Sequence, residues 1–125
     1  DIDDKTVFQK TIDFVIKAGI DLPRFTVITP FPSTDLFNRL KKENRILSLD
    51  WSLYNAQNVV FKPKNMSVNT LQNGLKYVWR ECYKPTNIFK RLSKSRTQLL
   101  YSLVANIGYN NYSKEIQNLT CSLHN

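Results

Sequence analysis

A short apolar segment that runs through a proline-rich turn into an amphipathic helix constrains the fold of this chain most. Residues 25–40 read FTVITPFPSTDLFNRL. Their first four residues are typical of a buried parallel strand, although a buried helical segment has the same pattern. Pro30 and Pro32 fix two backbone torsions and end the strand. Because ligands of α/β folds bind at the carboxyl ends of strands, we expect a site at the Thr29–Thr34 turn; an ordinary strand-turn-helix corner is the alternative.

Helical patterns lie on both sides of this segment. Residues 5–18 form an amphipathic pattern that ends at Gly19. Residues 68–83 predict a helix whose inward stripe is Leu71, Leu75, Val78, Trp79 and Cys82. A later helix is expected over residues 96–107, with Gly108 as its stop. Its inward stripe is expected to be Leu99, Leu100, Leu103, Val104 and Ile107. Residues 58–61 favour a second strand.

Four motifs resemble, in order and spacing, the carboxyl-terminal part of radical SAM proteins that contain a cobalamin (B12)-binding domain. They are DDKTVF at residues 3–8, TPFPSTDLFNRLKKENRIL at 29–47, DWSLYNAQNVVFKPKNMS at 50–67 and NIGY at 106–109. Two positions depart from the family pattern. Ser33 stands where the family has Gly, and Asn58 stands where it often has His. Since Ser disfavours a positive φ, we expect the turn around Ser33 to differ in detail.

The resemblance implies a fold as well as a family. The expected fold class is an α/β fragment, predominantly helical, in which the last βα unit or units of a partial (β/α) barrel of the TIM type precede a helical extension. Residues 1–47 would form the end of the radical SAM barrel, beginning just after its fifth strand. Residues 48–125 would form the mostly helical carboxyl-terminal extension.

The resemblance also implies a role at a cofactor site. The parent protein would be a radical SAM enzyme, namely a cobalamin-dependent methyltransferase or a relative of one, that uses S-adenosyl-L-methionine (SAM), a [4Fe-4S] cluster and cobalamin. This chain would close one side of the barrel and help to shape the site for SAM and a small-molecule substrate. The residues expected to bind the cofactor are Ile28, Thr29 and Pro30, against the SAM adenine through backbone groups, and Phe31, facing the adenosine or the substrate.

Three further residues are candidates for the substrate side of that site: Trp51, Tyr54 and Lys64. The two aromatic rings could stack on a ligand, but aromatic side chains at a domain seam more often serve packing.

The chain alone is expected to lack radical SAM activity. The cluster requires three closely spaced cysteine thiolates, whereas the sequence has Cys82 and Cys121, far apart. The sole histidine is His124, and no P-loop or dinucleotide-binding glycine pattern occurs. We therefore expect no catalytic residue, no metal site and no cofactor held by this chain alone. It would act with the remainder of the polypeptide or with a partner subunit.

Composition bounds the remaining possibilities. The net charge of +8 comes from scattered bases without a nucleic-acid-binding motif, which argues against nucleic acid as a partner. No apolar run is long enough to span a membrane, and the acidic start does not resemble a secretory signal, so a cytoplasmic location is expected. The alternative to the enzyme is a free-standing, non-enzymatic basic interaction module or the remnant of a degenerate gene.

Overall fold

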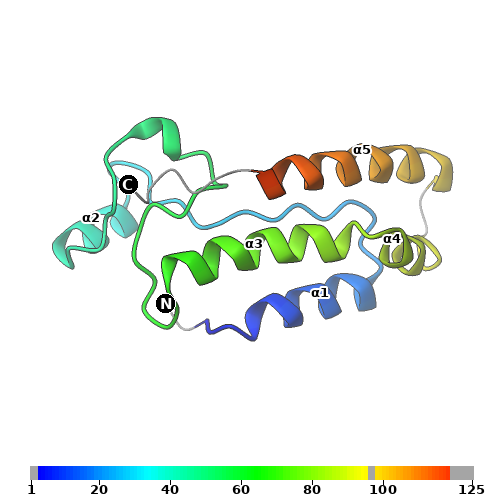
Figure 1. Ribbon diagram of the computed structural model, residues 1–125, viewed down its shortest axis with the longest axis horizontal. Helices are drawn as coiled ribbons and strands as arrows, with labels where there is room; N and C mark the ends of the chain where they lie inside the picture. Colours follow the sequence, from blue (N-terminus) through cyan, green and yellow to red (C-terminus); the bar gives the residue numbers. More distant parts are fainter. Residues whose placement is uncertain (1–2, 96–97, 119–125) are drawn as a thin grey trace. The chain divides into compact units, whose positions relative to one another are not determined.

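The computed structural model describes residues 3–95 and 98–118, and its regular structure is helical (Figure 1). The helices in chain order are α1 (Val7–Ala18), α2 (Asp35–Lys42), the short 3-10 helix η1 (Trp51–Leu53), α3 (Val68–Cys82), α4 (Pro85–Leu92) and α5 (Leu99–Asn118). Within the described ranges, β structure is limited to an isolated antiparallel bridge between Ile46 and Phe61. The predicted predominance of helix is confirmed.

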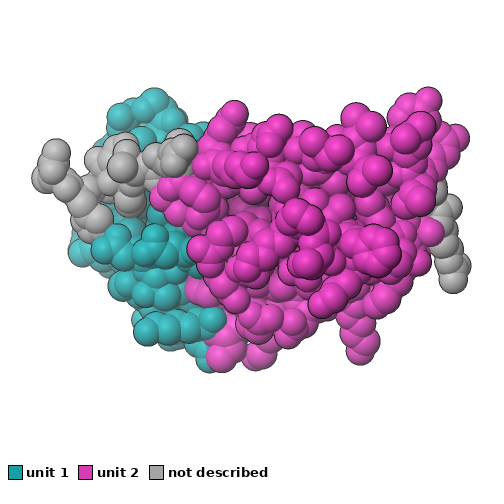
Figure 2. Space-filling model, turned by 45° about the vertical axis from the view of Figure 1, so that its right-hand side comes forward, with its two compact units in different colours: residues 1–5, 26–75, 120–125 teal, residues 6–25, 76–119 magenta. Residues whose placement is uncertain are grey.

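The described residues divide into two compact units (Figure 2). Unit 1 comprises residues 3–5 and 26–75, and unit 2 comprises residues 6–25, 76–95 and 98–118. Helix α3 is divided between them, with residues 68–75 in unit 1 and residues 76–82 in unit 2. The predicted boundary at residue 47 concerns the end of a barrel and stays a prediction.

The segment predicted as the central strand is extended chain instead. The Val27 amide donates to the carbonyl of Ala56 at 2.9 Å, in a loop, and no ladder develops from this bond in the described residues. The second predicted strand, at residues 58–61, lies beside residues 45–47. The Leu47 amide donates to the Val60 carbonyl at 2.9 Å, and the Lys62 amide donates to the Arg45 carbonyl at 2.8 Å. A strand requires a neighbour that satisfies its amides along its length, and the described residues offer residues 25–28 a single bond of this kind.

The core of unit 1 forms around residues 59 and 60, whose side chains are fully buried. The Gln72 side chain fixes this segment because it accepts from the Val59 amide at 3.0 Å and donates to the Gln57 carbonyl at 2.8 Å. Leu40 of α2 is also buried there. The side-chain amide of Gln72 thus satisfies two main-chain groups of an extended segment that has few sheet hydrogen bonds.

Unit 2 is organised around the second half of α3. Val78, Trp79 and Cys82 are buried, which confirms the predicted inward stripe of this helix. The Trp79 indole donates to the Phe25 carbonyl at 3.0 Å, and the Tyr83 hydroxyl donates to the Pro23 carbonyl at 2.7 Å. These bonds hold the extended chain that follows α1 against α3.

A buried arginine joins four segments of unit 2. Arg91 of α4 is fully buried and donates to the carbonyls of Ile20 at 2.7 Å, Asp21 at 2.8 Å and Cys82 at 3.1 Å. It also donates to the side-chain oxygen of Asn106 in α5 at 2.8 Å. A buried guanidinium is stable only with such partners, so this network fixes which face of α5 lies inward.

Helix α5 differs from its prediction in length and in orientation. It continues through Gly108, the predicted stop, to Asn118. The predicted inward stripe is exposed; Leu100 is 71% exposed and Val104 is 64% exposed. The buried positions of the helix are Ser102, Asn106, Ser113 and Ile116. The predicted stripe was wrong because Arg91 requires the side-chain oxygen of Asn106 as an acceptor. Asn106 is on the polar side of α5, so that side faces inward.

None of the helices that the structure describes combines the length and the apolar character needed to cross a membrane.

Candidate functional site

The predicted site is a turn that local hydrogen bonds close. The Phe31 amide donates to the Thr29 carbonyl at 3.0 Å, and the Thr34 hydroxyl donates to the Phe31 carbonyl at 2.7 Å. The Thr34 oxygen also accepts from the Phe37 amide at 3.2 Å, which makes Thr34 the N-cap of α2. The turn is therefore held by its own backbone and by the helix that follows.

The turn presents apolar side chains on either side of a buried anchor. Pro30 is fully buried, whereas Ile28 is 68% exposed and Phe31 is 51% exposed. Thr29 is half-buried, and its hydroxyl donates to the Val27 carbonyl at 3.2 Å. The arrangement offers exposed apolar surface next to a fixed backbone, which is chemistry suited to a ring system rather than to a charged group.

Ser33 takes the left-handed conformation that glycine adopts readily. Its φ is +65°, in a region where the backbone of an L-residue other than glycine is strained. The expectation for the substitution of Gly by Ser was a turn that differs in detail. In this chain the serine instead adopts the positive φ, at a cost of about 1–2 kcal/mol for an L-residue.

The two aromatic candidates are brought together, but they are not equally accessible. The ring centroids of Trp51 and Tyr54 are 4.9 Å apart, and the ring centroid of Phe37, a residue of α2, lies 6.1 Å from that of Trp51. Tyr54 is only 6% exposed; its hydroxyl donates to the Ser48 carbonyl at 2.7 Å, and burial raises its pKa. Trp51 is 52% exposed. Tyr54 thus supports the ring of Trp51, as the packing alternative predicts, and Trp51 keeps an accessible surface.

Lys64 is exposed near an acidic side chain of unit 1. The pKa of Glu43 is lowered mainly by its hydrogen bond from Arg45, at 2.8 Å, and further by the positive charge of Lys64. Asn58, the second departure from the family pattern, donates to the Asn55 side chain at 3.1 Å. The binding roles of all seven candidates remain predictions.

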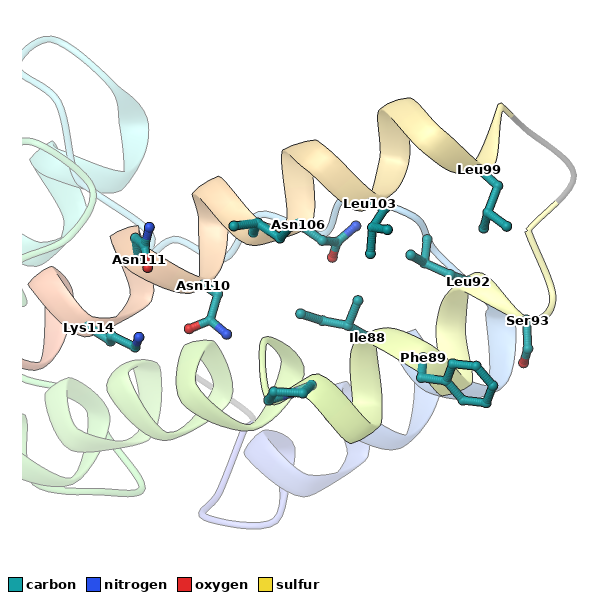
Figure 3. A pocket seen from close by; sticks show the side chains of 12 residues that line it. Ile88, Phe89, Leu92, Ser93, Leu99, Leu103, Asn106, Asn110, Asn111 and Lys114 are labelled. Atoms are coloured by element: carbon teal, nitrogen blue, oxygen red, sulfur yellow. The ribbon is translucent and has the colours of Figure 1, made fainter.

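Two surface pockets are lined by residues that the sequence did not single out as a site. A pocket of about 300 Å³ in unit 1 is lined by Lys41, Asn44, Ile46, Leu47, Ser48 and Leu49. A pocket of about 540 Å³ in unit 2 lies between α4 and α5 (Figure 3). The sequence signal for this second pocket is the run of leucines in α5, which the helical pattern predicts to lie in the core.

The donor atoms of the described residues do not fit an iron-sulfur cluster. Cys82 is buried, and desolvation raises its pKa to about 11, so it is a neutral thiol rather than a thiolate ligand. Among residues 3–95 and 98–118 no group of three or more His, Cys, Asp or Glu side chains is placed to hold a metal ion.

Comparison with known proteins finds methyltransferases among the relatives of this chain. It is 35% identical over 92 residues to bacteriochlorophyllide d C-12(1)-methyltransferase of Chlorobaculum tepidum, a match that covers 74% of this chain and 20% of the relative. It is 30% identical over 79 residues to bacteriochlorophyllide d C-8(2)-methyltransferase of the same organism, covering 58% of the chain and 18% of the relative. An uncharacterized methyltransferase of Pyrococcus horikoshii is 29% identical over 75 residues, covering 60% and 16%.

The chain thus spans about a fifth of the length of these curated relatives. No solved structure matches it significantly. Residues 34–122, well over half of the sequence, match the family described as Domain of unknown function (DUF4070). The chain therefore belongs to the DUF4070 family, which is found at the carboxyl terminus of B12-binding radical SAM methyltransferases, and the predicted family is confirmed.

Proposed function

We propose that this chain works as the carboxyl-terminal part of a longer, cobalamin-dependent radical SAM methyltransferase. The observation that carries the proposal is the 92-residue match to a methyltransferase about five times as long as the matched segment. The [4Fe-4S] cluster would be held by the rest of the enzyme, because the thiol of Cys82 is buried and neutral. SAM and cobalamin would also be held largely by the rest of the enzyme. The reducing cytoplasm, where such a thiol persists, is the proposed location.

The part of this chain in that enzyme is to shape the SAM site. Ile28, Thr29 and Pro30 would lie against the adenine, mainly through backbone groups, and Phe31 would face the adenosine or the substrate. The rigidity of the turn supports this role, since hydrogen bonds and a buried proline fix its backbone before any ligand binds.

Trp51 and Lys64 are the proposed contacts on the substrate side. The exposed ring of Trp51, supported by Tyr54, could stack on a flat unsaturated methyl acceptor. Two relatives are named for methylating bacteriochlorophyllide d. Lys64 would contact an anionic group of the acceptor.

The length of the native polypeptide is the first test. An antibody against residues 68–83 should detect in source cells a product several times heavier than the 14.6 kDa of this chain. A native product of 14.6 kDa would contradict the proposal and favour the interaction module.

Phe31 provides the second test. In the longer polypeptide, Phe31→Ala should raise the dissociation constant for SAM about two- to twelvefold, because an aromatic contact contributes about 0.5–1.5 kcal/mol beyond its buried area. Equilibrium dialysis with labelled SAM measures it. Phe14→Ala, at an exposed phenylalanine on α1, is the matched control and should leave binding unchanged. An equal loss of SAM affinity in both variants would contradict the assignment of Phe31 to the SAM site.

A further inference from the structure

In its first half, helix α5 buries polar residues and exposes apolar ones, the reverse of an ordinary amphipathic helix. Ser102 and Asn106 are buried, while Leu100, Val104 and Ile107 are exposed. The inward position of Asn106 is fixed by Arg91 at 2.8 Å, so rotating the helix to bury its leucines would strip a buried guanidinium of a partner. A helix held in this orientation leaves an apolar face that water covers at a free-energy cost.

The exposed face continues into the pocket between α4 and α5. We call this pocket, with the apolar side chains on its two walls, the α4–α5 groove. Its apolar walls are Ile88, Phe89 and Leu92 from α4 and Leu99, Leu103 and Ile107 from α5. Figure 3 shows Ile88 and Leu92 opposite Leu99 and Leu103, with Asn110, Asn111 and Lys114 farther along α5. The groove is therefore apolar at one end and polar, with a positive charge, at the other.

We propose that the α4–α5 groove receives an amphipathic helix from the part of the longer polypeptide outside this chain. This inference rests on the proposed function, because it requires that longer polypeptide. The relatives are long enough to contain such a helix, because four fifths of the first methyltransferase lies outside the matched segment.

The shape of the groove favours a helix as its occupant. Leu99 and Lys114 are fifteen residues apart on one helix, which at about 1.5 Å per residue gives a wall of about 22 Å. Leu99, Leu103 and Ile107 are spaced four residues apart, which forms the ridge that packs between the side chains of a neighbouring helix. Helix-in-groove recognition uses apolar anchors at this spacing.

The charge of the chain favours an acidic occupant over a second copy. Lys114 lines the polar end of the groove, and Lys90 follows Phe89 on α4. Two copies docked through this face would bring these lysines together in a chain of net charge +8. We therefore expect the occupying helix to carry Asp or Glu beside its apolar stripe.

Photo-crosslinking from inside the groove tests the proposal. Leu103 is replaced by p-benzoylphenylalanine in the polypeptide expressed from the whole gene, and crosslinked peptides are identified by mass spectrometry. We expect an intramolecular product with one amphipathic, acidic helix outside this chain. The same photoreactive residue at Lys10, an exposed position on α1, is the control and should not give that product.

Charge variants sharpen the result. Leu99→Glu with Ile107→Glu should lower the crosslink yield about tenfold or more, because unpaired carboxylates would enter an apolar interface. Lys114→Glu should lower the yield, and Lys114→Arg should preserve it. Both Leu99 and Ile107 are exposed, so the helical circular dichroism of the longer polypeptide should survive the double substitution.

The outcomes separate this inference from the proposed function. A long polypeptide whose position 103 crosslinks to a second copy, to a lipid or to nothing overturns the groove assignment alone. A native product of 14.6 kDa overturns both. A crosslink yield that the charge variants leave unchanged also overturns the assignment.

Discussion

Ser33 carries strain that a smaller residue would remove. With φ at +65°, its backbone adopts a left-handed conformation that costs an L-residue about 1–2 kcal/mol. Glycine removes this strain but loses more entropy on folding, about 0.5–1 kcal/mol. We expect Ser33→Gly to raise the free energy of unfolding by about 0.5–1 kcal/mol, measured by urea denaturation.

A serine with ordinary backbone geometry is the control for this prediction. Ser93, at the end of α4, has φ at −63°. Ser93→Gly should destabilise the chain by about 0.5–1 kcal/mol, since it gains flexibility without relieving strain. If both substitutions change stability in the same direction, the positive φ of Ser33 is not what determines the effect.

At the scale of the element, Gly108 tests the course of α5. It lies inside the helix, and a Cβ built there meets no atom within 4 Å. Gly108→Ala should therefore stabilise the 125-residue chain by about 1 kcal/mol, through helix propensity alone. Thermal unfolding followed by circular dichroism gives the sign.

Gly19 provides the opposite case. It ends α1 at a φ of +64°, and a Cβ there would lie 2.9 Å from the Cβ of Lys94. Gly19→Ala should therefore destabilise the chain. Loss of stability in Gly108→Ala as well would mean that residue 108 ends α5, as the sequence pattern predicts.

The contrast between α3 and α5 shows what could be predicted from the sequence. The stripe that contains Val78 and Trp79 was predicted because apolar burial decides the orientation of α3. In α5 the hydrogen-bond partner of buried Arg91 determines which face lies inward, and no local sequence pattern predicts that Asn106 is this partner. In the candidate site, the proline turn followed from residue types, whereas the positive φ of Ser33 depends on the closed turn around it.

At the scale of the whole molecule, each compact unit contains one of the two tryptophans. Trp51 belongs to unit 1 and Trp79 to unit 2. Helix α3 is a single helix shared by both units, so loss of one half should destabilise the other. We expect the two reporters to unfold at the same urea concentration, within about 0.3 M, which is about 0.5 kcal/mol at a typical slope.

Fluorine NMR on chain labelled with 5-fluorotryptophan measures both transitions in one sample. Trp51→Phe assigns the resonances, and it is a mild change because Trp51 is half exposed. Coincident midpoints support one cooperative unfolding reaction. A Trp51 midpoint clearly below that of Trp79 would show that unit 1 unfolds by itself.

The contacts of Arg91 have a consequence for how freely this sequence can change. Three of its acceptors are main-chain carbonyls, of Ile20, Asp21 and Cys82, and every amino acid supplies a carbonyl. Substitution at those three positions leaves these oxygens available as long as the backbone keeps its course. Among the contacts of Arg91, the one that orients α5 therefore depends on the chemical identity of two side chains, at positions 91 and 106.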